Sequence, residues 1–584
     1  MGELNPICIG RVSQVLGSTV TVRLDADLAG VSPLWQGRLQ PVGQVGSLLV
    51  LPQGPVQLLA SVSLVGLRET DDAQISAVAY ASGRSLQLQL LGEVDALGRF
   101  QRGVSSYPGL DDPVHFPPQE VLSLIHPQKS ADRIRVGRLS ASDGTAVTLD
   151  VQRLLTRHSV IVGSTGSGKT SAVASILQQL AEGDWPSANI VVIDPHGEYA
   201  NAFPERASVL AVSSGDSSSR LQVPYWALPA HDILTALSGS ETHNATLTNR
   251  FSELVADARR KYANTCTWLK SDEDVNADTP IPFNLHEVWH QLDYENSMVV
   301  DKKQGGTALV RKLGDPGSLT PTEFEPYGQG GAAPFQGPSY NRFLSVPSHI
   351  RSRMKDPRFD FFLKPDSSVI DDDPLAVVIN SWLGGSRPIS IMDFSGVPTE
   401  TADLAIGVVL QLIFELCLRS TAENGVGRHR PVLVVMEEAH RFLADGPNVK
   451  LARDSVNRIA REGRKYGIGT MLVSQRPSEL PETAFSQAGT VLSLRLTNAT
   501  DQARVRSSLP DSVSGLADLL SALRTGEAVI SGEAISLPSR VVIDSPYPAP
   551  LAEDPNLSGW RAPSGPNDVS LALSEWRGLV SSPL

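Results

Sequence analysis

Short runs of apolar and polar residues alternate along the first part of the chain. Runs such as CIGRVSQVLGSTVTVRL and SLQLQLLGEV are rich in strand-forming residues, and clusters of Gly, Pro and Asp separate them at short intervals. Short strands spaced in this way are typical of a small all-β sandwich or barrel. The pattern therefore predicts an N-terminal all-β domain over residues 1–130.

The pattern changes at about residue 155, where apolar, β-branched runs begin to alternate with helical periodicity. SVIVGS is followed by the helical pattern SAVASILQQL and then by NIVVID. This alternation indicates βαβ units and a parallel sheet. We expect the first part of an α/β core at residues 131–205. The second part, at residues 386–546, contains the strand-like runs PISIMDFSG, PVLVVMEE, GTMLVSQ and TVLSLRL.

Two regions have weaker patterns. Residues 206–385 contain helical stretches around FSELVADARRKYA and FNLHEVWHQLDYE, together with a Gly/Pro-rich segment at residues 302–338. We expect a helical insertion with a long surface loop there. Residues 547–584 begin as a linker and end in a short helical pattern, which we interpret as a C-terminal tail.

The composition is that of an ordinary folded protein. With 584 residues, of which 41% are hydrophobic and 19% charged, the chain could form two to four domains of about 150 residues each. Three widely spaced cysteines and the lack of a signal-peptide pattern favour a reduced, cytoplasmic location. The apolar run Leu404–Leu418 is interrupted by Gln411 and Glu415. It predicts a buried helix rather than a membrane span, so we expect no membrane contact.

The chain is acidic overall, with 63 Asp and Glu against 50 Lys and Arg and a formal net charge of -13. This excess argues against a protein that coats nucleic acid with evenly spread positive charge. Net charge does not describe the distribution of charge, so a locally basic channel is compatible with it.

One segment carries a phosphate-binding motif. HSVIVGSTGSGKT contains G-x-x-x-x-G-K-[ST] between a strand pattern and a helical pattern, which is the context that this motif requires. Its glycines let backbone N–H groups point at phosphate oxygens, and the following helix adds its positive N-terminal end. Lys169 would reach the β- and γ-phosphates of ATP, and the Thr170 hydroxyl would bind Mg²⁺. A Gly-rich turn that binds nothing is the alternative, which the complete motif disfavours. The expected ATP-binding residues are Gly163, Ser164, Thr165, Gly166, Ser167, Gly168, Lys169, Thr170 and Ser171.

Acidic residues follow two of the strand-like runs. VLVVMEEAH places Glu437 and Glu438 at the end of a very apolar run, where Glu437 would hold Mg²⁺ and Glu438 would orient or deprotonate water. Alternatively, both simply begin the next helix, where acids are favourable. NIVVIDPHGEY carries Asp194 and Glu198, which could polarise the site from a second strand end, and His196, which reads as a turn residue.

Polar and basic residues complete the candidate site. GIGTMLVSQ predicts a strand that ends at Gln475, where ATPases of this type place a residue that touches the γ-phosphate or water. The preceding helix carries a basic face that includes Arg461 and Arg464. A solvated face is the simpler explanation, but in an oligomer one of them could reach a neighbour's nucleotide. Arg157 precedes the first strand and could act on phosphate within its own subunit.

A literal H-E-x-x-H pattern is also present, formed by His286, Glu287 and His290 on a predicted helix. Two imidazoles four residues apart can bind zinc. Three fixed positions occur by chance in long chains, and no obvious third-ligand motif follows. We therefore consider zinc-dependent proteolysis a minor alternative.

Taken together, GSTGSGKT, VVIDPHGEY, VVMEEAHRFL, REGRKYGIG and SQRPSEL resemble, in order and spacing, the motifs of HerA-type ATPases. This family belongs to the HerA/FtsK superfamily of ring-shaped DNA-translocating motors. RSRMKDPRFDFFL is similar to a stretch of the family's inserted helical region, and TGEAVISGEAISLPSRVVI to its closing strands. The resemblance implies an α/β fold with a RecA-like P-loop NTPase core, an N-terminal small β-barrel and an inserted helical region.

The resemblance also implies roles for single residues. It assigns nucleotide binding, metal binding and hydrolysis to Lys169, Thr170, Glu437, Glu438 and Gln475. Arg157 matches a basic residue with a same-subunit role. The arginine that acts on the neighbouring subunit lies in the Arg461–Arg464 segment, and both arginines stay open as candidates.

The function that the resemblance implies is ATP- and Mg²⁺-dependent movement along double-stranded DNA by a homohexameric ring. Such a ring works with a nuclease or an NAD-consuming effector, in DNA processing or antiphage defence. The alternatives are a nucleotide-dependent scaffold for a partner effector enzyme and a conjugation- or secretion-type ATPase. A ring that encloses DNA needs positive charge only on its inner wall, so we expect an acidic exterior and a basic lining. The stretch Lys302–Arg311 is a candidate pore loop.

Overall fold

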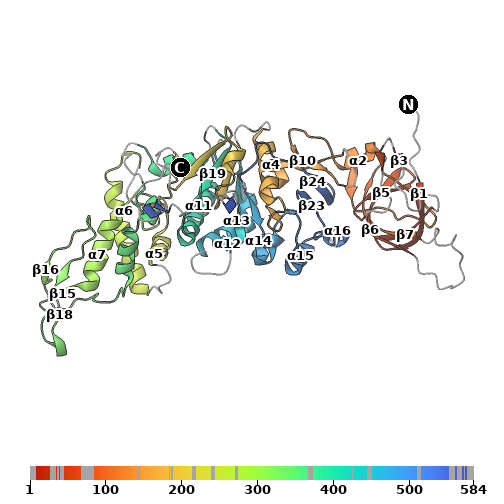
Figure 1. Ribbon diagram of the computed structural model, residues 1–584. Coiled ribbons are helices and arrows are strands. Elements are labelled where there is room, and N and C mark those ends of the chain that lie inside the picture. The colour runs from red at the N-terminus through yellow and green to blue at the C-terminus, as the bar shows by residue number, and fades with distance from the viewer. Residues whose placement is uncertain are drawn as a thin grey trace.

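A computed structural model gives the structure of the chain. It describes residues 8–25, 34–35, 38–39, 45–67, 84–140, 145–182, 185, 188–212, 219–238, 244–269, 274–365, 372–383, 385, 387–423, 425–443, 450–509, 514–551, 560–561, 569–570 and 573–574. The described part of the chain is elongated, with an all-β unit at one end, a helical unit at the other and a large mixed sheet between them (Figure 1).

The N-terminal unit is a closed barrel. Its strands pair in the order β2-β1-β9-β5-β6-β7, and pairing between β2 and β7 closes the sheet. Apolar side chains alternate with exposed ones along these strands and fill the interior, for example Val20, Leu58 and Leu88. This confirms the all-β prediction and selects a barrel over a sandwich. The strands are β1 (Cys8–Leu16), β2 (Thr19–Leu24), β5 (Leu48–Gln53), β6 (Val56–Leu67), β7 (Arg84–Val94) and β9 (Pro113–His115), with β8 (Phe100–Arg102) added beside β7 and a small hairpin of β3 (Leu34–Trp35) and β4 (Arg38–Leu39).

The central unit is an 11-stranded sheet in the order β11-β10-β24-β23-β22-β12-β21-β20-β13-β19-β14. From β22 to β14 all neighbours are parallel, and these strands are nearly continuous apolar runs because both faces are covered. The remaining strands extend the sheet in antiparallel fashion. The bounds are β10 (Arg133–Leu139), β11 (Ala146–Asp150), β12 (Ser159–Val162), β13 (Asn189–Asp194), β14 (Ala207–Ala211), β19 (Ile389–Asp393), β20 (Val432–Met436), β21 (Ile468–Ser474), β22 (Thr490–Ser493), β23 (Glu527–Gly532) and β24 (Ser539–Ile543).

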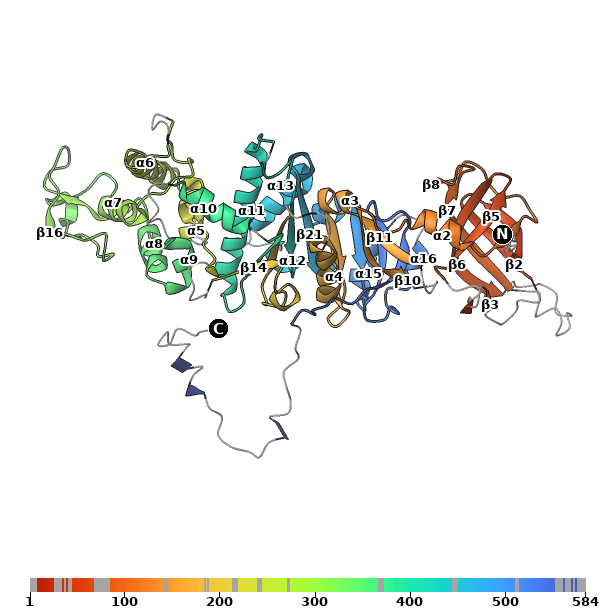
Figure 2. The ribbon, with the colours of Figure 1, turned by 90° about the horizontal axis from the view of Figure 1, so that it is seen from above.

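Helices cover both faces of this sheet. Figure 2 shows α11 (Thr399–Arg419) and α13 (Lys450–Tyr466) on one side and α4 (Lys169–Ala181) on the other. Within α11, residues Thr401–Arg419 have the length and hydropathy to cross a membrane, but 72% of the most apolar stretch is buried in the fold. The prediction of a buried helix there is confirmed. Smaller helices around the sheet are α2 (Gln119–Ile125), α3 (Val151–Thr156), α12 (Ala439–Leu443), α14 (Glu482–Ser486), α15 (Ala499–Arg506) and α16 (Ser514–Ala517).

The helical unit follows β14 and returns to the sheet at β19. The expected start of this insertion at residue 206 is wrong, because β14 pairs in parallel with β19 and belongs to the central sheet. The Gly/Pro-rich segment is also not one plain loop, since one short antiparallel pair forms within it and a second pair joins it to the preceding residues 299–300. The elements are α5 (Ala230–Ser238), α6 (Ala245–Ala263), α7 (Leu285–Ser297), α8 (Val346–Met354), α9 (Asp360–Leu363), α10 (Pro374–Trp382), β15 (Val299–Val300), β16 (Val310–Lys312), β17 (Glu323–Phe324) and β18 (Phe335–Gln336).

Candidate nucleotide-binding site

The phosphate-binding motif forms the turn between β12 and α4. Gly166 and Gly168 have φ angles of 71° and 97°, which side chains with a Cβ rarely adopt. A Cβ built on Gly163 would lie 2.4 Å from the Ser167 Oγ and 2.9 Å from the Leu494 Cβ. The Ser167 Oγ is itself buried without a hydrogen-bond partner among the described residues. A tight turn at a helix N-terminus with an unsatisfied polar atom fits a bound phosphate chain.

Lys169 lies at the start of α4 and is buried. Its Nζ is 3.4 Å from the backbone oxygen of Ser164, inside the turn. Burial lowers the pKa of Lys169, and the carboxylates of Glu437, Glu438 and Glu198 act in the opposite direction. The structure thus brings the lysine of the motif and acids from two other strand ends into one electrostatic cluster.

Asp194 is the last residue of β13 and Glu198 follows the strand, and the two carboxylates have different positions. Glu198 reaches the phosphate-binding turn, where its Oε2 accepts a hydrogen bond of 3.0 Å from the Thr170 hydroxyl. The Asp194 carboxylate is fully buried and accepts hydrogen bonds from the backbone N–H groups of His196, Gly197 and Tyr199. Asp194 therefore shapes the turn that presents Glu198. His196 contributes a backbone group to this turn, consistent with its interpretation as a turn residue.

Glu437 is buried at the end of β20, with 3% of its surface exposed. Burial raises its pKa to about 8, although a hydrogen bond from Tyr199 acts to lower it. That bond joins the Tyr199 hydroxyl to the Glu437 Oε2 at 2.6 Å. A carboxyl group held in this state becomes a strong anionic ligand once a cation lies beside it.

Glu438 has an unusual backbone conformation, with φ of 50°. Its Oε1 accepts a 2.6 Å hydrogen bond from the Gln475 amide, and the Gln475 Oε1 accepts one of 2.7 Å from the Thr165 hydroxyl. A chain of hydrogen bonds thus connects the phosphate-binding turn, the end of β21 and the second acidic residue. Helix α12 begins at the next residue, Ala439, so these acids do precede a helix while their side chains also converge on the turn.

Two contributors to this cluster were not predicted. The His440 Nδ1 lies 3.2 Å from the Glu438 Oε2 and 3.2 Å from the Ser474 Oγ, and burial lowers the pKa of His440. Tyr199 holds Glu437, as described above. Neither residue forms part of a spaced motif. The only sequence signal for His440 is its position two residues after Glu438.

Two arginines near the end of α13, Arg461 and Arg464, lie away from the phosphate-binding turn. Arg458 is occupied within the subunit, because its Nη1 is 2.7 Å from the Glu415 Oε1 and its guanidinium lies 4.2 Å from the centre of the Phe414 ring. Arg461 and Arg464 are exposed. They lie near the end of α13, which leads directly into the amino end of β21, whereas the phosphate-binding turn follows the carboxyl end of β12. These two parallel strands are neighbours, so both arginines lie at the opposite edge of the sheet.

The structure places Arg157 away from the phosphate-binding turn of its own subunit, although the family resemblance implies a same-subunit role for it. This residue precedes β12, a strand of four residues, so about 10–13 Å of strand separates it from the phosphate-binding turn. Its guanidinium forms an ion pair with Glu533. The next residue, His158, packs against α13, because a Cβ built on Gly463 of that helix would lie 3.5 Å from the His158 ring. Arg157 therefore lies beside the end of α13. Arg157 therefore shares the edge of the sheet that carries Arg461 and Arg464.

The H-E-x-x-H pattern lies on α7, in the helical unit. Glu287 forms a 2.7 Å ion pair with Lys261, and the His290 Nε2 is 3.4 Å from the Thr322 hydroxyl. Across the described part of the chain, no group of three or more His, Cys, Asp or Glu side chains is arranged to hold a metal ion. The candidate pore stretch Lys302–Arg311 lies in the same unit, at the end of the molecule farthest from the barrel (Figure 1).

Comparison with known families gives two matches that together span the central and C-terminal parts of the chain. The family described as "Helicase HerA, central domain" matches residues 134–413, and that described as "Helicase HerA-like C-terminal" matches residues 389–546. The matched residues include the central sheet, apart from the first residue of β10, and every residue of the cluster described above.

Individual relatives agree with these matches. The chain is 26% identical over 466 residues to the DNA double-strand break repair helicase HerA of Sulfolobus acidocaldarius, covering 80% of this chain and 79% of that protein. It is 25% identical to the protein of the same name from Pyrococcus furiosus, over 73% and 71% of the two chains. Among solved structures, VirB4 of Thermoanaerobacter pseudethanolicus is 16% identical, with a TM-score of 0.45 over 71% of this chain and 98% of that one.

Proposed function

The chain belongs to the family of HerA-type ATPases, and on this basis we propose that it hydrolyses ATP with Mg²⁺ to move along double-stranded DNA as a homohexameric ring. The observation that carries the proposal is the convergence on one turn of Lys169, Thr170, the two acids after β20 and Gln475. This combination binds a nucleotide and positions water, which a simple anion site does not require.

The side chains divide the chemistry between them. The glycine turn and Lys169 hold the phosphates, and the Thr170 hydroxyl and Glu437 are the groups that would hold Mg²⁺, with Glu198 beside them. Bound Mg²⁺ supplies charge neutralisation at the β- and γ-phosphates. Glu438 accepts the proton of the attacking water, and Gln475 fixes the position of its carboxylate. The low exposure of these groups strengthens their interactions with developing charge.

A second subunit completes the site in this proposal. One subunit presents its nucleotide at the carboxyl edge of the sheet, while exposed arginines lie at the amino edge. In a closed ring with head-to-tail contacts, the amino edge of each subunit faces the nucleotide of its neighbour. Arg461 or Arg464, together with Arg157, then stabilises the charge of the transferred phosphoryl group.

We further propose that the ring works in the cytoplasm with an effector enzyme, such as a nuclease or an NAD-consuming enzyme. The barrel supports this proposal, because it lies at one end of the molecule and contributes no side chain to the nucleotide-site cluster in the described structure (Figure 1). It is therefore available for a partner. The biological setting is DNA processing or antiphage defence.

The proposal is tested by measuring ATP hydrolysis with and without linear duplex DNA, and the oligomeric state by light scattering. We expect a hexamer whose turnover rises when duplex is added, and a Lys169→Ala variant with no turnover in either condition. A monomeric protein whose rate of ATP hydrolysis does not change when duplex is added would refute the proposed motor function.

The separate barrel also favours a second candidate, a nucleotide-dependent scaffold that assembles and regulates a partner effector. Purification of the effector and the ATPase separately and together distinguishes the two. Directional movement by the ATPase alone supports the motor. Both candidate functions require nucleotide binding. If the Lys169→Ala variant with ATP activated the effector as strongly as the natural chain does, this result would support neither the motor nor the scaffold.

A further inference from the structure

One arginine beside the barrel contacts a turn of the central sheet. Arg102 ends β8, and its guanidinium donates hydrogen bonds to three backbone oxygens of the turn between β23 and β24: Nη2 to Gly532 at 2.7 Å and Ile535 at 2.5 Å, and Nε to Ser536 at 2.9 Å. Three carbonyl groups held by one planar donor fix the turn in position and orientation.

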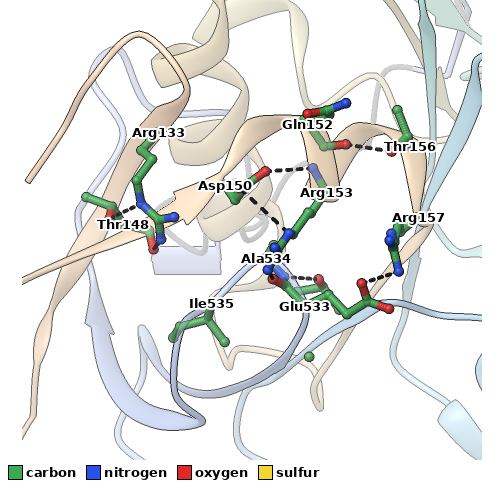
Figure 3. Close-up of polar contacts among 12 residues, drawn as sticks. Arg133, Thr148, Asp150, Gln152, Arg153, Thr156, Arg157, Glu533, Ala534 and Ile535 are labelled. Carbon is green, nitrogen blue, oxygen red and sulfur yellow. Dashed lines mark hydrogen bonds and ion pairs between the residues drawn. The ribbon is translucent and has the colours of Figure 1, made fainter. Parts of the chain in front are cut away.

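The same turn is also held by α3 and by the residue that caps this helix. The Asp150 N–H donates to the Ala534 oxygen at 2.8 Å, and the Arg153 Nη1 donates to the Glu533 oxygen at 3.0 Å. Asp150 also caps α3, because its carboxylate accepts the Arg153 N–H at 2.8 Å. Figure 3 shows these contacts side by side, with the Glu533 side chain extended toward Arg157.

Glu533 and Arg157 end this chain of contacts. Their side chains form an ion pair and are 42% and 32% exposed. The backbone is held as well, since Gly489 donates to the Arg157 oxygen at 2.7 Å and accepts from the Glu533 N–H at 2.6 Å. A guanidinium has five N–H donors in a rigid fork, and the ion pair engages it through Nη1. This contact orients the guanidinium, and about one third of the Arg157 side chain is exposed.

We propose that Glu533 is a positioning residue that orients the Arg157 side chain toward the nucleotide of the neighbouring subunit. Through Arg102, this orientation depends on the position of the barrel relative to the central sheet. The inference rests on the proposed ring. It changes Arg157 from a same-subunit group to one that acts across the interface. It also connects the barrel to the ATPase site through a series of contacts. These contacts run from β8 through the β23–β24 turn to the end of α3. A partner that moves the barrel therefore changes hydrolysis without touching the nucleotide.

The interface role of Arg157 is tested by mixing subunits. Arg157→Ala retains the phosphate-binding turn, and Lys169→Ala retains the arginine. If Arg157 acts on the neighbour, rings co-assembled from equal amounts of the two variants regain hydrolysis at up to about one quarter of their interfaces, although each variant alone is inactive. Mixed rings that stay inactive would show that Arg157 acts within its own subunit and would overturn the inference.

The positioning role is tested by kinetics of the intact protein. For Glu533→Ala we expect kcat to fall about 10-fold with KM for ATP unchanged, because misdirecting a group that acts in the transition state does not weaken nucleotide binding. Glu533→Gln keeps an acceptor oxygen and should recover part of the loss. Arg102→Ala should lower kcat in the same way, and the double variant should lose less than the product of the two single losses.

Two matched controls have ion pairs elsewhere. Arg99→Ala removes a barrel arginine that pairs with Asp95, and Glu253→Ala removes a glutamate that pairs with Arg250 in the helical unit. Both should hydrolyse ATP like the natural chain. Unchanged kcat in Glu533→Ala and Arg102→Ala, in a protein that forms rings and responds to duplex, would refute the positioning role alone. If the natural chain forms no ring, the proposed function fails and this inference fails with it.

Discussion

At the scale of single residues, Glu438 shows how a side chain of the nucleotide site is fixed in position. A non-glycine residue in the left-handed region costs about 1–3 kcal/mol, and such conformations persist where the surroundings fix them. Here Gln475 holds the carboxylate from the end of β21, and Thr165 holds Gln475 from the phosphate-binding turn. The strained backbone turns the second of two adjacent acids toward the site, while the first is directed at Tyr199.

Replacing Glu438 by glutamine should separate binding from hydrolysis. The amide keeps the size of the side chain but cannot accept a proton at neutral pH, so we expect hydrolysis to fall about 100-fold or more. ATP should still bind, because Lys169 and the glycine turn are unchanged. Turnover and binding of a fluorescent ATP analogue measure the two effects, with Lys169→Ala as the control that loses both. Turnover near that of the natural chain would mean that another group is the base.

The arginines of α13 should also separate into two kinds. For Arg461→Ala or Arg464→Ala, we expect one variant to lose duplex-stimulated turnover about 100-fold or more while it still forms rings. Arg458→Ala should instead lower the free energy of unfolding by about 1 kcal/mol, because it loses an ion pair and a contact with an aromatic ring. Turnover and thermal melting of the three variants test this. Equal turnover in all three would contradict an interface arginine on this helix.

At the scale of elements, Glu527 ties together the antiparallel extension of the sheet. It lies on β23 with 1% of its side chain exposed, and Arg540 on β24 donates to both of its carboxylate oxygens. Burial alone would raise its pKa, but hydrogen bonds from Arg540, Ser140 and the Arg524 N–H outweigh burial and lower the pKa to about 2. Three neighbouring strands thus depend on one ionised carboxylate.

This dependence predicts a defined effect of pH. A carboxyl group with a lowered pKa stabilises the fold above its ordinary pKa of about 4.5, and the contribution disappears as the pH falls from there toward 2. Glu527→Gln should therefore lower the free energy of unfolding by about 2 kcal/mol at pH 7, and by progressively less below pH 4.5. Thermal melting of both proteins across this range measures the difference. Glu253→Gln, at an exposed ion pair, is the control. A difference that stays constant between pH 7 and pH 3 would contradict this account.

Most elements of the central sheet could be predicted, because its strands are long apolar runs that stand out from their surroundings. The run that forms β14 has only the five residues ASVLA and directly follows a turn, so nothing in its pattern distinguished it from the insertion. Gly163 and Lys169 could be predicted because phosphate binding demands those residue types at fixed spacing, and Glu438 because it follows a very apolar strand-like run. The positions of Tyr199, His440 and Glu533 depend on how distant segments pack, and a local pattern does not contain that information.

At the scale of the whole molecule, the elongated shape separates the tasks. The barrel and the helical unit lie at opposite ends, and the sheet between them carries the nucleotide site (Figure 2). An acidic exterior with a basic inner wall is still a prediction for the assembled ring. In that arrangement, contacts with DNA go to phosphates and are independent of base sequence.

Duplex binding should therefore depend steeply on salt. Displacement of counterions by several lysines and arginines should lower affinity by about 1000-fold between 50 and 200 mM salt, equally for unrelated sequences. Fluorescence anisotropy with two duplexes of different sequence measures this. Variants of Lys302 and Lys303 test whether the candidate pore stretch provides these contacts, since each should reduce the salt dependence. Binding that is insensitive to salt would contradict a phosphate-lined channel.

The placement of Arg157, Arg461 and Arg464 at one edge of the sheet and the phosphate-binding turn at the other has a genetic consequence. In the proposed ring each chain contributes to two catalytic sites: its phosphate-binding turn belongs to one site, and its arginines belong to the site of the neighbouring subunit. A chain that carries both Lys169→Ala and Arg157→Ala damages its own site and the site of its neighbour, so in rings formed from equal amounts of this chain and the natural one only about one quarter of the sites keep both halves. Expression of this double variant beside the natural chain should therefore be dominant-negative and lower ATP hydrolysis more than expression of either single variant, and the loss should rise with dose.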